Sequence, residues 1–171
     1  MNIVLREWDS KSILESKAQC DNWIMLDTHA QSPRKFYSFE LTADNGKISN
    51  VAFLSDDTGI TPSAVFFNRN KYFVVQHDTR VSFVEYSSLQ LITFYEFCSA
   101  GYELIILAKN NTLLCIHEIG VVCFNSNCQK IWEHSFNKII TFWTKCAEDK
   151  LVVKYEDGHK NILNLITGIM Q

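Results

Sequence analysis

Apolar runs alternate with short polar turns along most of the chain, and three segments share one pattern. Each consists of an apolar run, a tight polar turn and a second apolar run, at residues 72–83, 112–125 and 150–159. Regular spacing of such segments is typical of a repeated supersecondary unit. The aligned positions before or at the turns are 40 and then 38 residues apart: His77, His117 and Tyr155. The pattern therefore predicts short antiparallel strands arranged in successive sheets.

Residues 63–171 carry the regular part of this pattern. Twelve short strands are predicted there, with no helix between them, in three blade-like repeats at 63–97, 101–136 and 138–171. The polar turns between the strands contain few glycines or prolines, while the strands are rich in aromatic and β-branched residues. Consecutive four-stranded sheets are the arrangement that this spacing favours.

The first 60 residues follow the pattern less closely. Asp44-Asn45-Gly46 separates two apolar runs and predicts a hairpin, because Asn-Gly readily takes the positive φ angles of a tight turn. Residues 10–19 predict a short helix, capped by Ser10 or Ser12. We expect residues 1–60 to form an irregular β segment, related to a degenerate first repeat. The whole chain, residues 1–171, is expected to be a single domain.

Several segments resemble the blades of quinoprotein- or WD-type β-propellers. They are Gly120–Asn125, Lys130–Glu133, and Asp157-Gly158 followed by Leu163–Gly168. The resemblance covers roughly residues 63–171 and implies an all-β fold of antiparallel four-stranded sheets that repeat every 38–40 residues. Three repeats and an N-terminal segment are too few for most closed propellers. We expect a partial, half-propeller-like arrangement or a small four-bladed propeller, with the N-terminal segment covering an exposed sheet edge.

Composition and charge exclude several classes of protein. The chain is 47% hydrophobic, 13% aromatic and only 20% charged, which excludes a largely disordered polypeptide. Its net charge is −3 and its pI is about 5.9, with no Lys/Arg-rich run, so a nucleic-acid partner is disfavoured and a basic partner is favoured. No basic segment with a long apolar core opens the chain, and no apolar run approaches the length of a membrane helix. We expect a cytoplasmic protein without membrane contact.

A group of cysteines and one histidine has the residue types of a zinc site: Cys115, His117, Cys123 and Cys128. Strand parity argues against zinc. A hairpin that turns at residues 118–119 places Cys123 on the face of Leu114, opposite Cys115 and His117. We therefore expect no metal site, and six free thiols, because the cytosol keeps cysteines reduced.

Catalytic patterns are weak. There is no Gly-x-Ser-x-Gly elbow and no glycine-rich phosphate loop. Cys20, Asp27 and His29 form one local grouping of nucleophile, acid and base, but catalytic partners are seldom so close in sequence. The histidines at or beside the turns, His77 and His117 among them, are expected to be solvated. We predict a protein that is not an enzyme and that holds no cofactor.

Carboxylates recur at the predicted turns. If the turns of stacked blades emerge on one side of the molecule, these side chains form an acidic rim that would bind a basic partner. The alternative is that Asp and Glu merely suit turns, with Lys47, Arg80 and Lys160 diluting the field. The candidate partner-binding carboxylates are Asp44, Asp78, Glu118, Glu156 and Asp157.

Trp132 completes the candidate site. It alternates along its strand with Lys130 and His134, which predicts a place on a polar face. Two roles are compatible with this position. The indole either stacks over a neighbouring blade or forms a binding hot spot, since tryptophan is enriched in such spots.

A small, mildly acidic β protein without catalytic residues is similar to bacterial immunity proteins, including those of contact-dependent growth inhibition systems. The similarity is one of class, in size and compartment. It implies that the chain binds one cognate cytotoxic domain, expected to be a basic nuclease, and occludes its active site with the help of opposite charge. The alternative is a β-propeller-like protein-interaction scaffold without a toxin partner. An enzyme with a propeller-type site is a third class.

Overall fold

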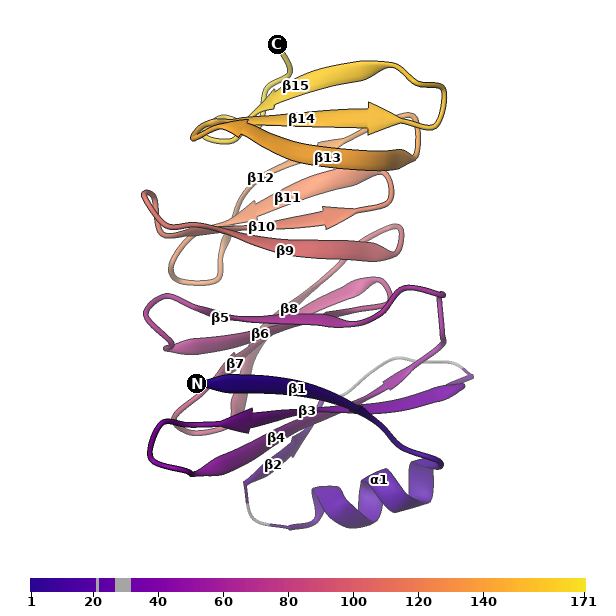
Figure 1. Cartoon of the computed structure of the whole chain (residues 1–171), viewed down its shortest axis with the longest axis vertical. Helices are drawn as coiled ribbons and strands as arrows, with labels where there is room; N and C mark the ends of the chain where they lie inside the picture. The colour runs from indigo at the N-terminus through magenta and orange to yellow at the C-terminus, as the bar shows by residue number, and fades with distance from the viewer. Residues whose placement is uncertain (21, 27–31) are drawn as a thin grey trace.

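Four β-sheets follow one another in a stack, in the order of the chain (Figure 1). The computed structural model describes residues 1–20, 22–26 and 32–171. Within them, the alternation of apolar and polar residues produces fifteen strands and one short helix. The sheets with their three or four strands each form a partial β-propeller-like fold, which confirms the all-β architecture predicted from the repeats.

The first sheet contains four strands in the order β1-β3-β4-β2. The strands β1 and β3 and the strands β3 and β4 pair antiparallel, whereas the short β2 runs parallel to β4. The predicted hairpin at residues 44–46 joins β3 to β4. The segment expected to be irregular is thus a regular sheet. The strand at residues 23–25 follows the apolar pattern, but its parallel pairing was not predicted. Its strands are β1 (Asn2–Glu7), β2 (Trp23–Met25), β3 (Lys35–Thr42) and β4 (Ile48–Ser55).

Helix α1 (Lys11–Ala18) covers the outer face of the first sheet (Figure 1). Ser10 caps the helix as predicted, because its side-chain oxygen accepts a hydrogen bond from the backbone nitrogen of Ile13 at 3.3 Å. Leu14, on the face of α1 that turns toward the sheet, is fully buried. No helix among the described residues is long and apolar enough to cross a membrane.

The other three sheets keep their strands in chain order, so each is a simple meander. Their hairpins fall where the sequence predicts them: His77 pairs with Arg80 and His117 pairs with Gly120. The second sheet holds β5 (Ser63–Phe67), β6 (Tyr72–His77), β7 (Arg80–Glu85) and β8 (Gln90–Glu96). The third holds β9 (Gly101–Leu107), β10 (Thr112–His117), β11 (Gly120–Phe124) and β12 (Lys130–Ser135), and the fourth holds β13 (Ile140–Ala147), β14 (Lys150–Tyr155) and β15 (Lys160–Asn164).

The fourth sheet has three strands rather than the predicted four. The terminal strand expected near Ile169 is reduced to one bridge between Leu163 and Met170. Its shortening follows from a turn after β15, in which the Asn164 side chain accepts hydrogen bonds from the backbone nitrogens of Ile166 and Thr167. Such a side-chain-to-backbone turn competes with continued strand pairing.

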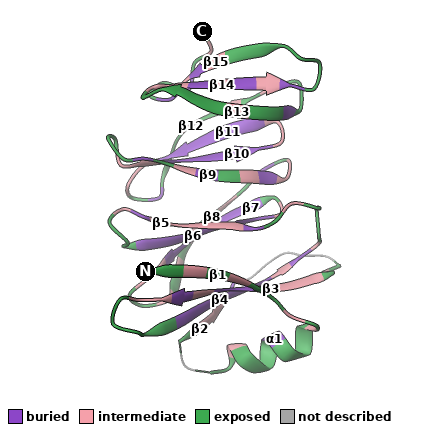
Figure 2. Ribbon diagram, in the orientation of Figure 1, coloured by how far each residue is buried: buried purple, intermediate pink, exposed green. Residues whose placement is uncertain are grey.

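Three apolar cores fill the spaces between the four sheets, because each central strand sends alternate side chains to its two faces. In β6, Phe73 and Val75 pack with the first sheet, while Tyr72 and Val74 pack with the third. Strand β10 repeats this alternation between the second and fourth sheets. Figure 2 shows the resulting burial, which is strongest along the central strands of the stack.

Two histidines beside the turns are buried, contrary to the expectation that they are solvated. His77 stacks on Phe53 with ring centroids 4.6 Å apart, and His117 stacks on Phe97 at 5.0 Å. Their exposed fractions are 4% and 0%. Tyr155 holds the equivalent position in the fourth sheet and packs edge-to-face on Phe136. An aromatic side chain from the preceding sheet or linker therefore covers each of these positions.

The cysteines divide into two groups. All six are free, as predicted, with three buried in the cores and three exposed: Cys115, Cys123 and Cys128 are buried, and Cys20, Cys98 and Cys146 are exposed. Burial raises the pKa of Cys123 to about 11 and that of Cys128 to about 12, and it raises the pKa of Cys115 well above its usual value. The buried thiols are therefore protonated and unreactive near neutral pH.

We expect three thiols to react with a disulfide reagent in the folded protein at about pH 8, and all six after unfolding. Thiolate is the reacting species, so the high pKa and the burial of the other three protect them. Absorbance of the released thiol counts the reactive cysteines. The control variant Cys128→Ser should leave the native count unchanged and lower the unfolded count by one. A native count above three would contradict the assigned burial.

Candidate functional site

The turns of the last three sheets lie in a row, because backbone hydrogen bonds join each turn to the linker that enters the next sheet. The nitrogen of Gly101 donates to the Asp78 carbonyl at 2.7 Å, and the nitrogen of Glu118 donates to the Ala100 carbonyl at 2.9 Å. The same arrangement follows one sheet later, where Ile140 donates to Glu118 and Glu156 donates to Ile139. Since packed sheets lie about 10 Å apart, the three turns stand at about that spacing. We call Asp78, Glu118 and Glu156 the acidic row.

Asp78 lies at the end of the row that is next to the first sheet, and hydrogen bonds hold its side chain in place. Its carboxylate accepts hydrogen bonds from Ser55 Oγ at 2.8 Å and from the Asp56 backbone nitrogen at 3.3 Å, and it lies 3.3 Å from His77 Nδ1. Burial by itself would raise the pKa of Asp78, but the hydrogen bonds from His77 and Ser55 outweigh it and lower the pKa. Asp78 is therefore an anchored anion with 15% of its side chain exposed.

Glu118 and Glu156 are the more available members of the row. Glu118 is half-buried and Glu156 is exposed. Neither forms an ion pair within the described ranges 1–20, 22–26 and 32–171. Their negative charges are thus directed to solvent from turns that the backbone network holds in place.

Asp157 lies next to the row but is already paired. Its carboxylate forms an ion pair with Lys138, and it lies 3.0 Å from His159 Nδ1. The hydrogen bonds from Lys138 and His159 lower the pKa of Asp157. This carboxylate contributes less free charge to the site than its position at a turn suggests.

Asp44 does not belong to the rim, which corrects the prediction that all five carboxylates share one side. It follows β3 at the hairpin before Ile48, whereas Asp78 binds Ser55 at the other end of β4. At about 3.3 Å per residue, the length of β4 separates them by more than about 20 Å. Asp44 instead pairs with the N-terminal amine at 2.7 Å. The hairpin between β3 and β4 therefore lies on the side of the stack opposite to the turns that carry Asp78, Glu118 and Glu156.

Trp132 packs between sheets, which is the stacking role rather than an exposed hot spot. Its indole is partly buried and packs against the core between the third and fourth sheets. The ring lies so close to Gly168 that an added Cβ there would be 2.6 Å from Trp132 Cδ2. Its Nε1 is buried and has no hydrogen-bond partner among the described residues. These contacts support the stacking role for Trp132.

The zinc candidates are divided as strand parity predicts. Leu114 is paired with Cys123 and His117 with Gly120. Cys115 packs in the core between the second and third sheets, and Cys123 packs in the next one. No group of three or more potential metal ligands occurs within the part of the chain that the structure describes.

A serine, an aspartate and a histidine lie together here, as in the triads of hydrolases: Ser55, Asp78 and His77. The sequence of hydrogen bonds among them differs from that of a triad. The Ser55 hydroxyl donates to the carboxylate and not to the imidazole, so the histidine cannot take its proton. His77 Nε2 is buried, with no partner among the described residues. Of the other grouping suggested by the sequence, Cys20 is exposed, while Asp27 and His29 lie outside the described residues.

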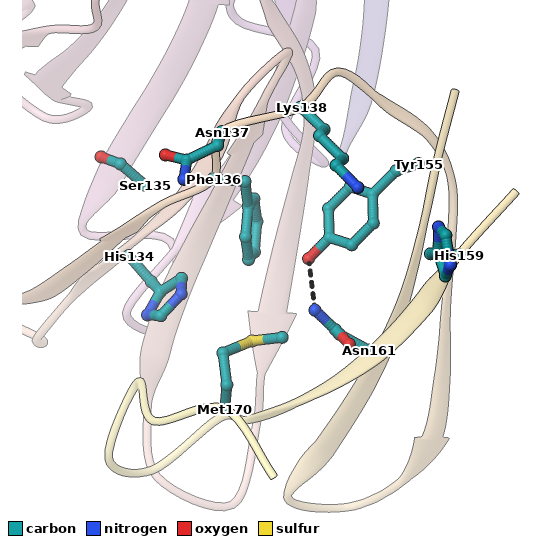
Figure 3. Close-up of a pocket in the computed structure, with 9 residues that line it drawn as sticks. All are labelled: His134, Ser135, Phe136, Asn137, Lys138, Tyr155, His159, Asn161 and Met170. Atoms are coloured by element: carbon teal, nitrogen blue, oxygen red, sulfur yellow. Dashed lines mark hydrogen bonds between the residues drawn. The ribbon is translucent and has the colours of Figure 1, made fainter. Parts of the chain in front are cut away.

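A cavity of about 440 Å³ opens beside the last turn of the row (Figure 3). Phe136 and Met170 supply apolar walls, and Asn161 Nδ2 donates to the Tyr155 hydroxyl at 3.2 Å. Lys138 and His159 line it as well, and both of them pair with Asp157. A molecule that binds along the acidic row would thus meet a partly apolar hollow at one end.

The sequence pattern missed two features of this site. Asp56 and Asp57 follow β4, and Asp56 is joined to Asp78 through its backbone nitrogen, so the loop after the first sheet adds acidic residues to the row. The pattern also did not reveal that linker residues bind the turns. Linker residues such as Ala100 and Ile139 are not distinctive, so only the fold could identify them.

Comparison with known proteins supports the fold alone. No protein-family model matches the chain, and no curated protein matches it in sequence. Among solved structures 155 chains match, including a dihydro-heme d1 dehydrogenase, NirN, in complex with DHE. That match has a TM-score of 0.60 and 8% sequence identity, and it covers 80% of this chain but 33% of the other. The chain is therefore similar to about one third of a β-propeller-like protein.

Proposed function

We propose that this protein is an immunity-type inhibitor, which binds a basic cytotoxic domain and covers its active site. The observation that supports the proposal is the acidic row, in which Glu118 and Glu156 present carboxylates from turns fixed by backbone hydrogen bonds, with no ion-pair partner among the described residues. A fixed row of charge meets a basic surface without the entropic cost of ordering a loop. Nuclease toxins are the favoured partners, since an enzyme that binds a polyanion has a basic active site.

The proposed inhibition is steric and needs no chemistry from the inhibitor. Complementary charge accelerates the encounter, and the stacked turns then lie across the entrance to the toxin's active site. The cavity beside Asp157 offers space for one protruding side chain of the partner, against Phe136 and Met170. The toxin would be met in the cytoplasm, where free thiols such as those of this chain are maintained.

The test is co-expression with the product of a neighbouring gene. That product should kill cells by itself and should be harmless when this protein is present, and the two purified proteins should form a tight complex. If the neighbouring product is harmless alone, or kills in both cases, the immunity function is wrong.

The charge mechanism predicts the behaviour of the double variant Glu118→Lys/Glu156→Lys. Its association rate with the toxin domain should fall about tenfold at low salt, and the rate should depend less on salt concentration. Stopped-flow fluorescence at several ionic strengths measures both. Because these carboxylates have no ion-pair partners in the described chain, the free energy of unfolding should change by less than about 0.5 kcal/mol.

A matched control carries the same change in net charge away from the row. Glu15→Lys/Asp44→Lys alters α1 and the hairpin at the opposite end of β4. It should associate at nearly the wild-type rate. Equal slowing by the two double variants would show that net charge, and not the acidic row, governs association.

A further inference from the structure

Within the described residues, the fourth sheet has an outer face that no other sheet covers, at one end of the stack (Figure 1). At the opposite end, α1 covers the first sheet. The residues on this face differ in type from those at the equivalent positions of the second and third sheets. The residues compared lie on the two strands that the corresponding hairpin joins in each sheet. The second sheet has Val74, Gln76, Val81 and Phe83 there, the third has Leu114, Ile116, Val121 and Cys123, and the fourth has Val152, Lys154, Lys160 and Ile162.

Those positions are buried in the second and third sheets and open in the fourth. Val152 and Ile162 are half-buried, Lys160 is exposed, and Phe142 on the neighbouring β13 is 53% exposed. Figure 2 shows strand β13 as largely exposed. The face therefore presents an aliphatic centre to solvent, with lysines on the same strands.

The lysines of this face are close to one another, and no acidic residue shares the outward strand positions with them. Lys154 and Lys160 are directly opposite across β14 and β15, and Lys150 lies on the same face of β14. Like charges at opposite positions of a sheet are destabilising. The outward positions of the three strands contain no Asp or Glu: they are Phe142, Thr144, Ala147, Lys150, Val152, Lys154, Lys160, Ile162 and Asn164.

Other lysines in or beside the third and fourth sheets form ion pairs. Lys109 pairs with Glu148 at 2.7 Å, and Lys138 pairs with Asp157. By contrast, Lys150, Lys154 and Lys160 form no ion pair within the described residues. Three lysines without an ion-pair partner among the described residues thus surround an apolar centre, although the net charge of the chain is −3.

We propose that the outer face of the fourth sheet is a docking surface for an acidic protein. Carboxylates of that partner pair with Lys150, Lys154 and Lys160, and its apolar side chains cover Val152 and Ile162. The aliphatic centre favours a protein over a nucleic acid, because a nucleic-acid backbone would place charged phosphates against apolar side chains. A second copy docked face to face about a twofold axis would place lysine against lysine. The surface is separate from the acidic row and has the opposite charge.

The experiment uses a synthetic peptide as the probe, with glutamates on both sides of two leucines, added to the ¹⁵N-labelled full chain at low salt. Amide resonances of β14 and β15 should shift in a saturable way, with a dissociation constant in the millimolar range or tighter. The variant Lys150→Glu/Lys154→Glu/Lys160→Glu should bind at least tenfold more weakly. Circular dichroism and urea unfolding establish that the variant is folded.

A single reversal, Lys154→Glu, serves if the triple variant does not fold. It relieves the Lys154–Lys160 repulsion and should still weaken peptide binding. Lys17→Glu/Lys47→Glu, which changes α1 and the first hairpin, should bind the peptide as the wild type does. Shifts that spread over the whole surface, or binding unaffected by the lysine reversals, would overturn the proposal.

Duplex DNA and anionic lipid vesicles are added as competing probes. Binding of either one at these lysines without binding of the peptide would also overturn the proposal, as would concentration-dependent self-association through this face. None of these outcomes bears on the toxin complex, because Glu118 and Glu156 remain unchanged. The docking surface and the immunity function can therefore fail separately.

Discussion

Replacing Gly120 with alanine is expected to lower the free energy of unfolding by about 3 kcal/mol, the upper range for overpacking a core. Gly120 follows the tight turn at residues 118–119 and pairs with His117. A Cβ atom at this position would lie 2.5 Å from His117 Nε2 and 2.8 Å from the backbone oxygen of His134. The imidazole is fully buried and the oxygen belongs to the paired strand β12, so neither can move away cheaply.

Urea unfolding of the variant measures this loss as a shift of the midpoint, and two glycines supply controls. Gly46 has a positive φ of 80°, and an added Cβ there would have nothing within 4 Å, so its replacement by alanine should cost only about 1 kcal/mol. At Gly101 an added Cβ would lie 2.4 Å from Nε2 of Gln76, a side chain that is itself buried and hydrogen-bonded to the Ile116 carbonyl. Gly101→Ala should therefore also cost more than Gly46→Ala. If Gly120→Ala is as mild as Gly46→Ala, close packing against His117 is not what requires glycine.

Acid is expected to destabilise the protein well before its carboxylates are protonated, because of His117. This imidazole is fully buried, stacks on Phe97, and has Ser99 Oγ 2.8 Å from its Nδ1, while Nε2 has no partner among the described residues. Burial outweighs the attraction of Glu133 and lowers the pKa of His117 to about 4 from 6.5. The folded state therefore keeps this histidine neutral where the unfolded chain protonates it.

The expected loss has a defined pH window. Above about pH 6.5 the histidine is neutral in both states and the stability is fully present. As the pH falls from about 6.5 to about 4, the unfolded state alone takes up the proton, and the free energy of unfolding drops by about 3 kcal/mol. Urea unfolding at several pH values measures this slope.

His117→Gln separates this contribution from that of the acids. Glutamine does not titrate and can still accept a hydrogen bond from Ser99, so the variant should be less stable at neutral pH but nearly independent of pH across that window. Asp78, whose pKa is lowered from 3.8, contributes a further loss only at lower pH. An unchanged slope in His117→Gln would assign the pH dependence to other groups.

Much of the fold was predictable from local pattern, and particular residues show where prediction stopped. The hairpins at His77 and His117 and the cap at Ser10 depend on neighbours within a few residues, and the structure confirms them. The acidic row was predictable only in part. Glu118 and Glu156 lie on one side of the stack because the third and fourth sheets follow their predecessors in the same way. The first sheet has the opposite orientation, so Asp44 lies at the other end of β4 from this side.

The sequence by itself determined which side chains share a strand face, because that alternation has a period of two residues and needs no information from elsewhere in the chain. This is why Cys115 and Cys123 were assigned correctly to opposite faces of their hairpin, which pack in different cores. Only the tertiary structure decided whether a face is covered. Val74 and Val152 are equivalent, yet the first is fully buried and the second is half-buried, because a sheet packs over the first and no sheet within the described residues packs over the second. Burial of His117 by Phe97 has the same cause, since the covering side chain comes from the linker that precedes the third sheet.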